Sequence, residues 1–155
     1  MTRGAAHRDD SLERFVRAQN PLLGQVRGEL AAGRKVTHWM WFVFPQVRGL
    51  GSSPMARRYA IASLEEAVEY LHHPVLGARL ADCTAWVTAV QGRPIEAILA
   101  YPDNLKFHSC MTLFAHAAVR AHTPAYGAVF RKAIEKYFGG REDVRTLELI
   151  GRTAG

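Results

Sequence analysis

The fold is decided by the run His38-Trp39-Met40-Trp41-Phe42-Val43-Phe44-Pro45-Gln46, which holds two of the chain's three tryptophans and two of its seven phenylalanines. A run this apolar has to be buried. Because nearly every position is apolar, its periodicity cannot distinguish a helix from a strand, although Trp, Phe and Val favour strands. No neighbouring segment has the pattern of a second strand that could pair with it. We therefore expect a short buried helix here.

Helical spacing of apolar residues, interrupted by Pro and Gly, continues along most of the chain on both sides of this run. The segment from about Asn104 to Ala121 is apolar around its whole circumference, which is typical of a central, buried helix. Ser63 and Glu66 match the capping box that begins a helix. The sequence thus predicts an all-α fold, a single compact multihelical domain of about seven to eight helices with short loops over residues 10–151, after a flexible tail at residues 1–9.

The composition is that of a globular protein. Of 155 residues, 48% are hydrophobic and 22% are charged, which is enough apolar material for a core and excludes disorder over most of the length. No apolar run approaches the roughly 20 residues of a membrane span, so no membrane partner is expected. The two cysteines, Cys83 and Cys110, do not make a disulfide framework, and we therefore expect a cytoplasmic protein with free thiols.

The net charge of +6 comes mostly from arginine, with sixteen Arg against four Lys. A basic balance is compatible with a nucleic-acid partner or with a small anion. The arginines, however, are scattered and interleaved with acidic residues, so they form no basic helix or arm. The pattern favours an ordinary charged surface or a small-anion site, and it argues against a nucleic-acid partner.

A basic, glycine-rich loop follows the aromatic run. It comprises Gly49–Pro54, is preceded by Arg48 and contains Ser52 and Ser53. Small residues let backbone amides approach an anion, and arginine binds phosphate in bidentate fashion. The loop lacks the terminal Gly-Lys-Ser/Thr of a P-loop. The alternative is a tight turn in which a serine caps the next helix.

Lys106 is unusual because it lies in the otherwise apolar segment 104–121. A buried ammonium needs a partner or a wet pocket. Lys106 therefore either lines a ligand site, where it binds a phosphate or carboxylate or reacts with a carbonyl, or it forms an ion pair with Asp103 or Glu96.

The polar and aromatic residues of the opening run are further candidates. Trp39 and Trp41 could stack on a planar ligand, and Gln46 could read an amide or a base edge; core packing and turn stabilisation are the alternatives. His38 is a candidate general acid or base because imidazole titrates near neutrality. Its alternative role is a hydrogen-bonded histidine at the edge of the core.

No metal site and no cofactor are predicted. His72 and His73 are adjacent, so on a helix they point about 100° apart and do not easily share one ion. His108, His116 and His122 are eight and six residues apart, with no intervening carboxylate at ligand spacing. Cys110 is expected to be a small core residue, and nothing in the pattern supports a nucleophilic pair with His38.

Three segments together resemble a known family. They are the run His38–Gln46, the loop Gly49–Ser53, and Lys106 followed by Ser109-Cys110-Met111-Thr112-Leu113-Phe114. They resemble the domain-of-unknown-function 1810 family, and the resemblance extends from about Leu12 to Ile150. It implies an all-α, multihelical fold and brings no assigned activity. The calpastatin-like label given to some members does not fit this chain, because an inhibitor of that kind is polar and disordered. The family often has a second serine where this chain has Cys110.

These observations predict a pocket that binds or processes a small anionic, phosphate-bearing ligand such as a nucleotide. The residues expected to bind it are Trp39, Trp41, Gln46, Arg48, Ser52, Ser53, Lys106 and Ser109, with His38 and Lys106 as candidate catalytic groups. The alternative is a non-enzymatic module that binds a protein or a nucleic acid.

Overall fold

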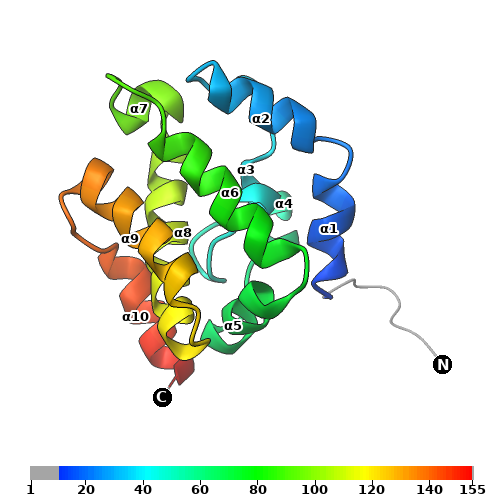
Figure 1. Ribbon diagram of the computed structural model, residues 1–155. Coiled ribbons are helices and arrows are strands. Elements are labelled where there is room, and N and C mark those ends of the chain that lie inside the picture. The colour runs from blue at the N-terminus through cyan, green and yellow to red at the C-terminus, as the bar shows by residue number, and fades with distance from the viewer. Residues whose placement is uncertain (1–10, 155) are drawn as a thin grey trace.

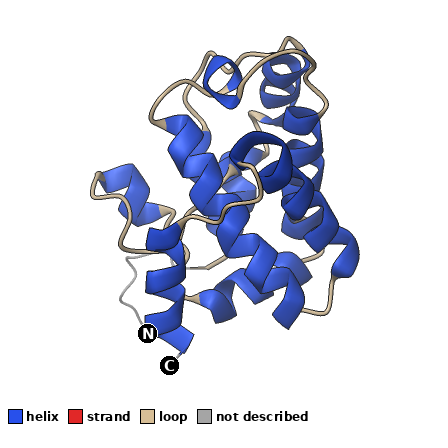
Figure 2. Ribbon diagram, turned by 90° about the vertical axis from the view of Figure 1, so that its left-hand side faces the viewer, coloured by secondary structure: helices blue, strands red, loops and turns tan. Residues whose placement is uncertain are grey.

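The protein is all-helical over residues 11–154, which a computed structural model describes, with side chains described for residues 11–151. Within this range it has ten helices and no strand (Figure 2). The helices are α1 (Glu13–Gln19), α2 (Leu23–Ala31), α3 (Met40–Val43), α4 (Pro54–Arg58), α5 (Leu64–His72), α6 (Leu76–Thr88), α7 (Ile95–Ile98), α8 (Asp103–Arg120), α9 (Pro124–Phe138) and α10 (Val144–Ala154).

The all-α fold is confirmed, but the predicted number of about seven to eight helices is wrong. Three of the ten helices, α3, α4 and α7, have only four or five residues each. Helices this short are single turns held by tertiary packing, because an isolated turn is unstable in water. The tail predicted for residues 1–9 lies outside the described residues. Among residues 11–154, no helix is long and apolar enough to cross a membrane.

The centre of the molecule is α8, as its uniformly apolar circumference predicts. It packs against α9, α5 and α10, and Figure 1 shows α6 and α9 crossing in front of it. Phe114 of α8 is fully buried, with ring centroids 5.1 Å from Tyr70 of α5 and 6.1 Å from Phe130 of α9. Both pairs of rings are tilted by 52°, and such contacts between aromatic rings are favourable. The core therefore joins helices from both halves of the sequence around α8.

The aromatic run forms α3 and the residues that flank it, which confirms the predicted short buried helix. Phe44 packs edge-on against Phe107 of α8, with ring centroids 5.0 Å apart. On the other side, the buried side chain of Gln19 in α1 donates a hydrogen bond of 2.7 Å to the carbonyl oxygen of Phe42. These contacts fix α3 between α1 and the first turns of α8. Trp41 is thereby held close to Lys106.

Candidate functional site

A cavity of about 520 Å³ lies beside α3, between α4 and the start of α8. This volume is within the range of small-molecule sites in proteins. Its described lining residues are Met40, Trp41, Phe44, Gln46, Val47, Arg48, Gly49, Gly51, Pro54, Ala56, Arg57, Arg58, Tyr59, Ala60 and Lys106. Residues 40–60 thus form nearly the whole wall, and Lys106 closes it from the opposite half of the chain.

The wall is held closed by a single parallel β-bridge between Val47 and Ile61. The amide of Arg48 donates to the carbonyl of Ile61 at 2.7 Å, and the amide of Ile61 donates to the carbonyl of Gln46 at 2.9 Å. The chain then turns at Gly49, whose φ of 107° is in a region that side-chain-bearing residues rarely adopt. These backbone contacts bring the ends of the segment 46–61 together and set the shape of the rim.

A buried arginine supports the wall from behind. Arg14 of α1 is only 5% exposed, and its guanidinium donates from Nε to the carbonyl of Arg58 and from Nη2 to that of Ala60, each at 2.9 Å. Both carbonyls belong to residues that line the cavity. Sequence reasoning assigned Arg14 no role, because a single basic residue in a helical pattern looks like a surface residue until its partners are known.

The cavity is strongly basic. Of the described residues, four cations (Arg48, Arg57, Arg58 and Lys106) line it, and no carboxylate does. The remaining wall is apolar or aromatic, with Trp41, Phe44 and Tyr59 among its residues. Positive groups gathered against low-dielectric walls raise the local concentration of anions.

Lys106 is held loosely enough to face a ligand. Its Nζ lies 5.7 Å from the centre of the Trp41 ring and 3.8 Å from Oδ1 of Asp103. The second distance is too long for a hydrogen bond. Asp103 forms its closer ion pair with Lys35, whose Nζ lies 2.8 Å from Oδ2 of Asp103. The predicted ion pair between Lys106 and Asp103 therefore exists, but it leaves the three donors of the ammonium without a hydrogen bond to any described residue.

The side chains of Gln46 and Arg48 are also available to bind a ligand. Their backbones form the β-bridge, while their side chains make no hydrogen bond or ion pair with the described part of the chain. The structure thus brings together four predicted site residues, Trp41, Gln46, Arg48 and Lys106, around one cavity.

Trp39, by contrast, does not line this cavity. It is fully buried, and its indole nitrogen donates to Oε1 of Glu29 at 2.9 Å. The expectation that Trp39 and Trp41 form one ligand-binding wall is therefore corrected. Trp39 precedes α3 and is held in the core by a carboxylate of α2, whereas Trp41 is only partly buried at the cavity.

The predicted serines also lie outside the lining. Ser53 caps α4 by accepting from the amide of Ala56 at 3.1 Å, which is the alternative that the loop pattern left open. The carbonyl of Ser52 accepts from Arg57, and this contact stabilises the turn. Ser109 donates to the carbonyl of Leu105 and to Asp143, each at 3.1 Å, and so links α8 to the start of α10.

The candidate acid or base His38 is exposed and is not among the lining residues. No described group of three or more His, Cys, Asp or Glu residues is placed to hold a metal ion. Lys106 is the one proposed catalytic candidate whose side chain reaches the cavity within the described structure.

Comparison with known proteins places the chain in a family. A model of the family described as "Protein of unknown function (DUF1810)" matches residues 9–150. The chain belongs to the DUF1810 family. The crystal structure of the conserved hypothetical protein Rv1873 from Mycobacterium tuberculosis, at 1.38 Å, is similar, with 55% sequence identity and a TM-score of 0.85. The match covers 90% of this chain and 96% of that one. Among curated proteins, no relative matches the chain.

Cys110 lies in the core of the protein. It is fully buried in α8, and burial raises the pKa of its thiol well above the usual value. Burial likewise raises the pKa of Cys83 to about 12. A protonated thiol is a poor nucleophile. Both cysteines therefore act as small apolar residues, and Cys110 cannot pair with the exposed His38.

Glu29 positions the segment before α3, a role that the sequence did not reveal. Burial raises the pKa of this carboxyl, but hydrogen bonds from the Thr37 hydroxyl, the amides of Val36 and Thr37, and the Trp39 indole outweigh burial and lower the pKa to about 2. The ionised carboxylate thus fixes the segment that leads into α3.

The substitution Glu29→Gln is expected to lower the free energy of unfolding at pH 7 by about 1 kcal/mol, because it replaces charge-assisted hydrogen bonds by neutral ones. The folded-state pKa is below the unfolded value of 4.5, so the ionised carboxylate stabilises the fold fully above pH 4.5. This stabilisation is lost as the pH falls towards 2. Denaturant unfolding of both proteins should therefore show a difference that narrows below pH 4.5; a difference independent of pH would contradict the assignment.

Proposed function

We propose that the cavity binds a small anionic, phosphate-bearing ligand with a planar ring, as a nucleotide has. The observation that carries this proposal is the set of four cations lining one cavity with no described carboxylate among them. Cations are not gathered in this way to stabilise a fold, because they repel one another. An anionic ligand would relieve that repulsion and use the free donors of Arg48 and Lys106.

Each residue has a role that follows from its chemistry. Trp41 offers an aromatic face for the ring, and base–aromatic stacking is worth about 1–3 kcal/mol per base. Arg48 can hold a phosphate through two parallel N–H donors, and Lys106 acts as a point charge beside Trp41. The amide of Gln46 can both donate to and accept from a ring edge. No reaction is assigned, and the proposal concerns binding.

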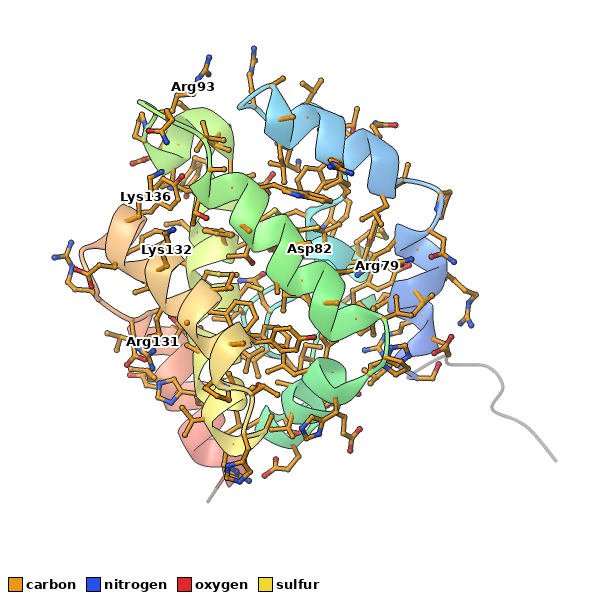
Figure 3. The ribbon with its side chains drawn as sticks, viewed as in Figure 1. Arg79, Asp82, Arg93, Arg131, Lys132 and Lys136 are labelled. Atoms are coloured by element: carbon orange, nitrogen blue, oxygen red, sulfur yellow. The ribbon has the colours of Figure 1, made fainter. Side chains whose placement is uncertain are left out.

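The substitution Lys106→Met tests the site. It keeps an unbranched side chain that is one atom shorter and removes the charge, so phosphate affinity should fall at least tenfold, because a hydrogen bond to a charged group contributes about 1.5–3 kcal/mol. The matched control is Lys132→Met, which removes the same charge from the exposed surface of α9 (Figure 3).

The measurement is a thermal-shift screen of both variants and the wild type with nucleotides, sugar phosphates and polyanions. We expect a nucleotide or sugar phosphate to stabilise the wild type and Lys132→Met, with the stabilisation lost in Lys106→Met. Equal stabilisation of the two variants would show that the ligand binds elsewhere.

The alternative, a module that binds a nucleic acid or a protein, has weaker support. Figure 3 shows other cations at the surface, Arg79 on α6 and Arg131, Lys132 and Lys136 on α9, with Asp82 among them. Three of these already have protein partners: Arg79 donates to Gln19, Arg131 pairs with Glu142, and Lys136 donates to the carbonyls of Thr88 and Val90. Salt-sensitive binding to any nucleic acid, unaffected by Lys106→Met, would favour this alternative.

A further inference from the structure

We infer further that the ligand carries two linked phosphoryl groups, as a nucleoside diphosphate does; this inference rests on the proposed function and specifies the ligand of the same cavity. The first argument is charge. A phosphate monoester carries about two negative charges at neutral pH. The described lining has four cations and no carboxylate, and the one carboxylate that pairs with Lys106, Asp103 at 3.8 Å, is shared with Lys35 at 2.8 Å, so a monoester would leave more than one positive charge without a counterpart. A second phosphoryl group supplies the missing charge.

The second argument is the number of unused donors. Arg48 and Lys106 make no hydrogen bond through their side chains to the described chain, and Arg58 makes only a contact with the ring of Tyr59, at 5.6 Å from its guanidinium carbon. Each guanidinium has five N–H donors and each ammonium has three. A terminal phosphate offers only about three strong acceptor oxygens. A diphosphate adds acceptors and satisfies more of these donors.

The third argument is placement. Lys106 lies beside Trp41, with 5.7 Å between its Nζ and the ring centre, so it is next to the aromatic face on which the ligand's ring would stack. Arg57 and Arg58 come from α4, a separate element of the wall. Arg57 also holds the carbonyl of Ser52, which fixes the rim at this point. The two groups of cations therefore suit two successive phosphates, the first at Lys106 and the second at α4.

This placement predicts different effects for two variants. Lys106→Met should weaken a monophosphate and a diphosphate alike. Arg58→Gln should weaken the diphosphate about tenfold more than the monophosphate, since Arg58 would contact the second phosphate directly and the first only through its charge. Arg58 is exposed, so its substitution is not expected to unfold the protein. The matched control is Arg93→Gln, an exposed arginine before α7 (Figure 3).

The experiment is calorimetric titration, at one fixed salt concentration, with adenosine, guanosine, their mono- and diphosphates, inorganic pyrophosphate and a dinucleotide joined by a diphosphate. We expect the diphosphate of at least one base to bind the wild type at least tenfold more tightly than its monophosphate, and Arg58→Gln to abolish that ratio while Arg93→Gln keeps it. Tight binding of the dinucleotide would show that the site accepts a diphosphate that bridges two nucleosides. Binding of the nucleoside diphosphate without binding of the dinucleotide would show that the site needs a terminal diphosphate. Both results support the inference.

Two outcomes separate failure of this inference from failure of the proposed function. Equal affinity for monophosphate and diphosphate, or a ratio unchanged in Arg58→Gln, would overturn the inference and leave the proposed anion site standing. Absence of binding by every phosphate in the series would overturn both.

Discussion

Replacement of Arg14 by methionine is expected to lower the free energy of unfolding by about 3 kcal/mol. Arg14 is buried, and its guanidinium donates to the carbonyl oxygens of Ser11, Arg58 and Ala60 at 2.6–2.9 Å. Methionine fills much of the same volume but donates no hydrogen bond. The carbonyl of Ala60, in a buried residue, then loses its partner, and an unsatisfied buried acceptor is costly.

The same substitution should weaken ligand binding, because the two carbonyls belong to the wall of the cavity. The measurement is denaturant unfolding together with the thermal-shift screen. A loss of about 3 kcal/mol corresponds to a fall in Tm of roughly 10 °C for a domain of this size. The matched control, Arg93→Met, removes an exposed arginine and should change stability by less than about 0.5 kcal/mol. Similar stability of the two variants would refute the role given to Arg14.

The second large effect is expected at Gly77, in the first turn of α6. A Cβ atom added there would lie 2.3 Å from the carbonyl oxygen of Leu71 and 3.1 Å from Cε2 of Tyr126. The nearest atom belongs to the backbone at the end of α5, so it cannot move aside as a flexible side chain can. Gly77→Ala therefore forces α5 and α6 apart and should destabilise the protein by about 2–3 kcal/mol.

The matched control for this prediction is Gly28→Ala in α2. Gly28 is exposed, and an added Cβ would meet nothing within 4 Å. Because glycine is unfavourable inside a helix, this substitution should stabilise the protein by about 0.7 kcal/mol. Chemical denaturation of both variants tests the pair: changes of opposite sign are expected, and a Gly77→Ala variant as stable as the wild type would show that the helices can separate without cost.

Local sequence patterns predicted most of the helices. The capping box at Ser63 is an example: its hydroxyl accepts from the amide of Glu66 at 3.1 Å, as expected. The central position of α8 was also predicted. These features depend on hydrogen bonds and side-chain spacing within about four residues, which a sequence displays directly. The predicted count of about seven to eight helices was too low, although the single-turn helix α3 was itself predicted.

The candidate site was predicted less completely, because the local sequence pattern cannot show which of several similar residues lines a cavity. Trp39 and Trp41 are two positions apart in the same apolar run, yet one is fully buried against Glu29 and the other lines the cavity. Ser53 and Ser109 were attractive as polar residues near the motif, but each is used by a nearby backbone or carboxylate group. Their hydrogen-bond partners could be identified only in the folded chain.

The sequence by itself determined that this is an all-α protein of the DUF1810 type, with a buried aromatic helix followed by a basic glycine loop. Only the tertiary structure decided that Lys106 lies beside Trp41, that Arg14 supports the wall through Arg58 and Ala60, and that four cations share one cavity. The physical reason is the separation along the chain of the residues that interact. Helices and caps arise from interactions between near neighbours in the chain, whereas a cavity is made by residues that packing brings together from more than forty positions apart.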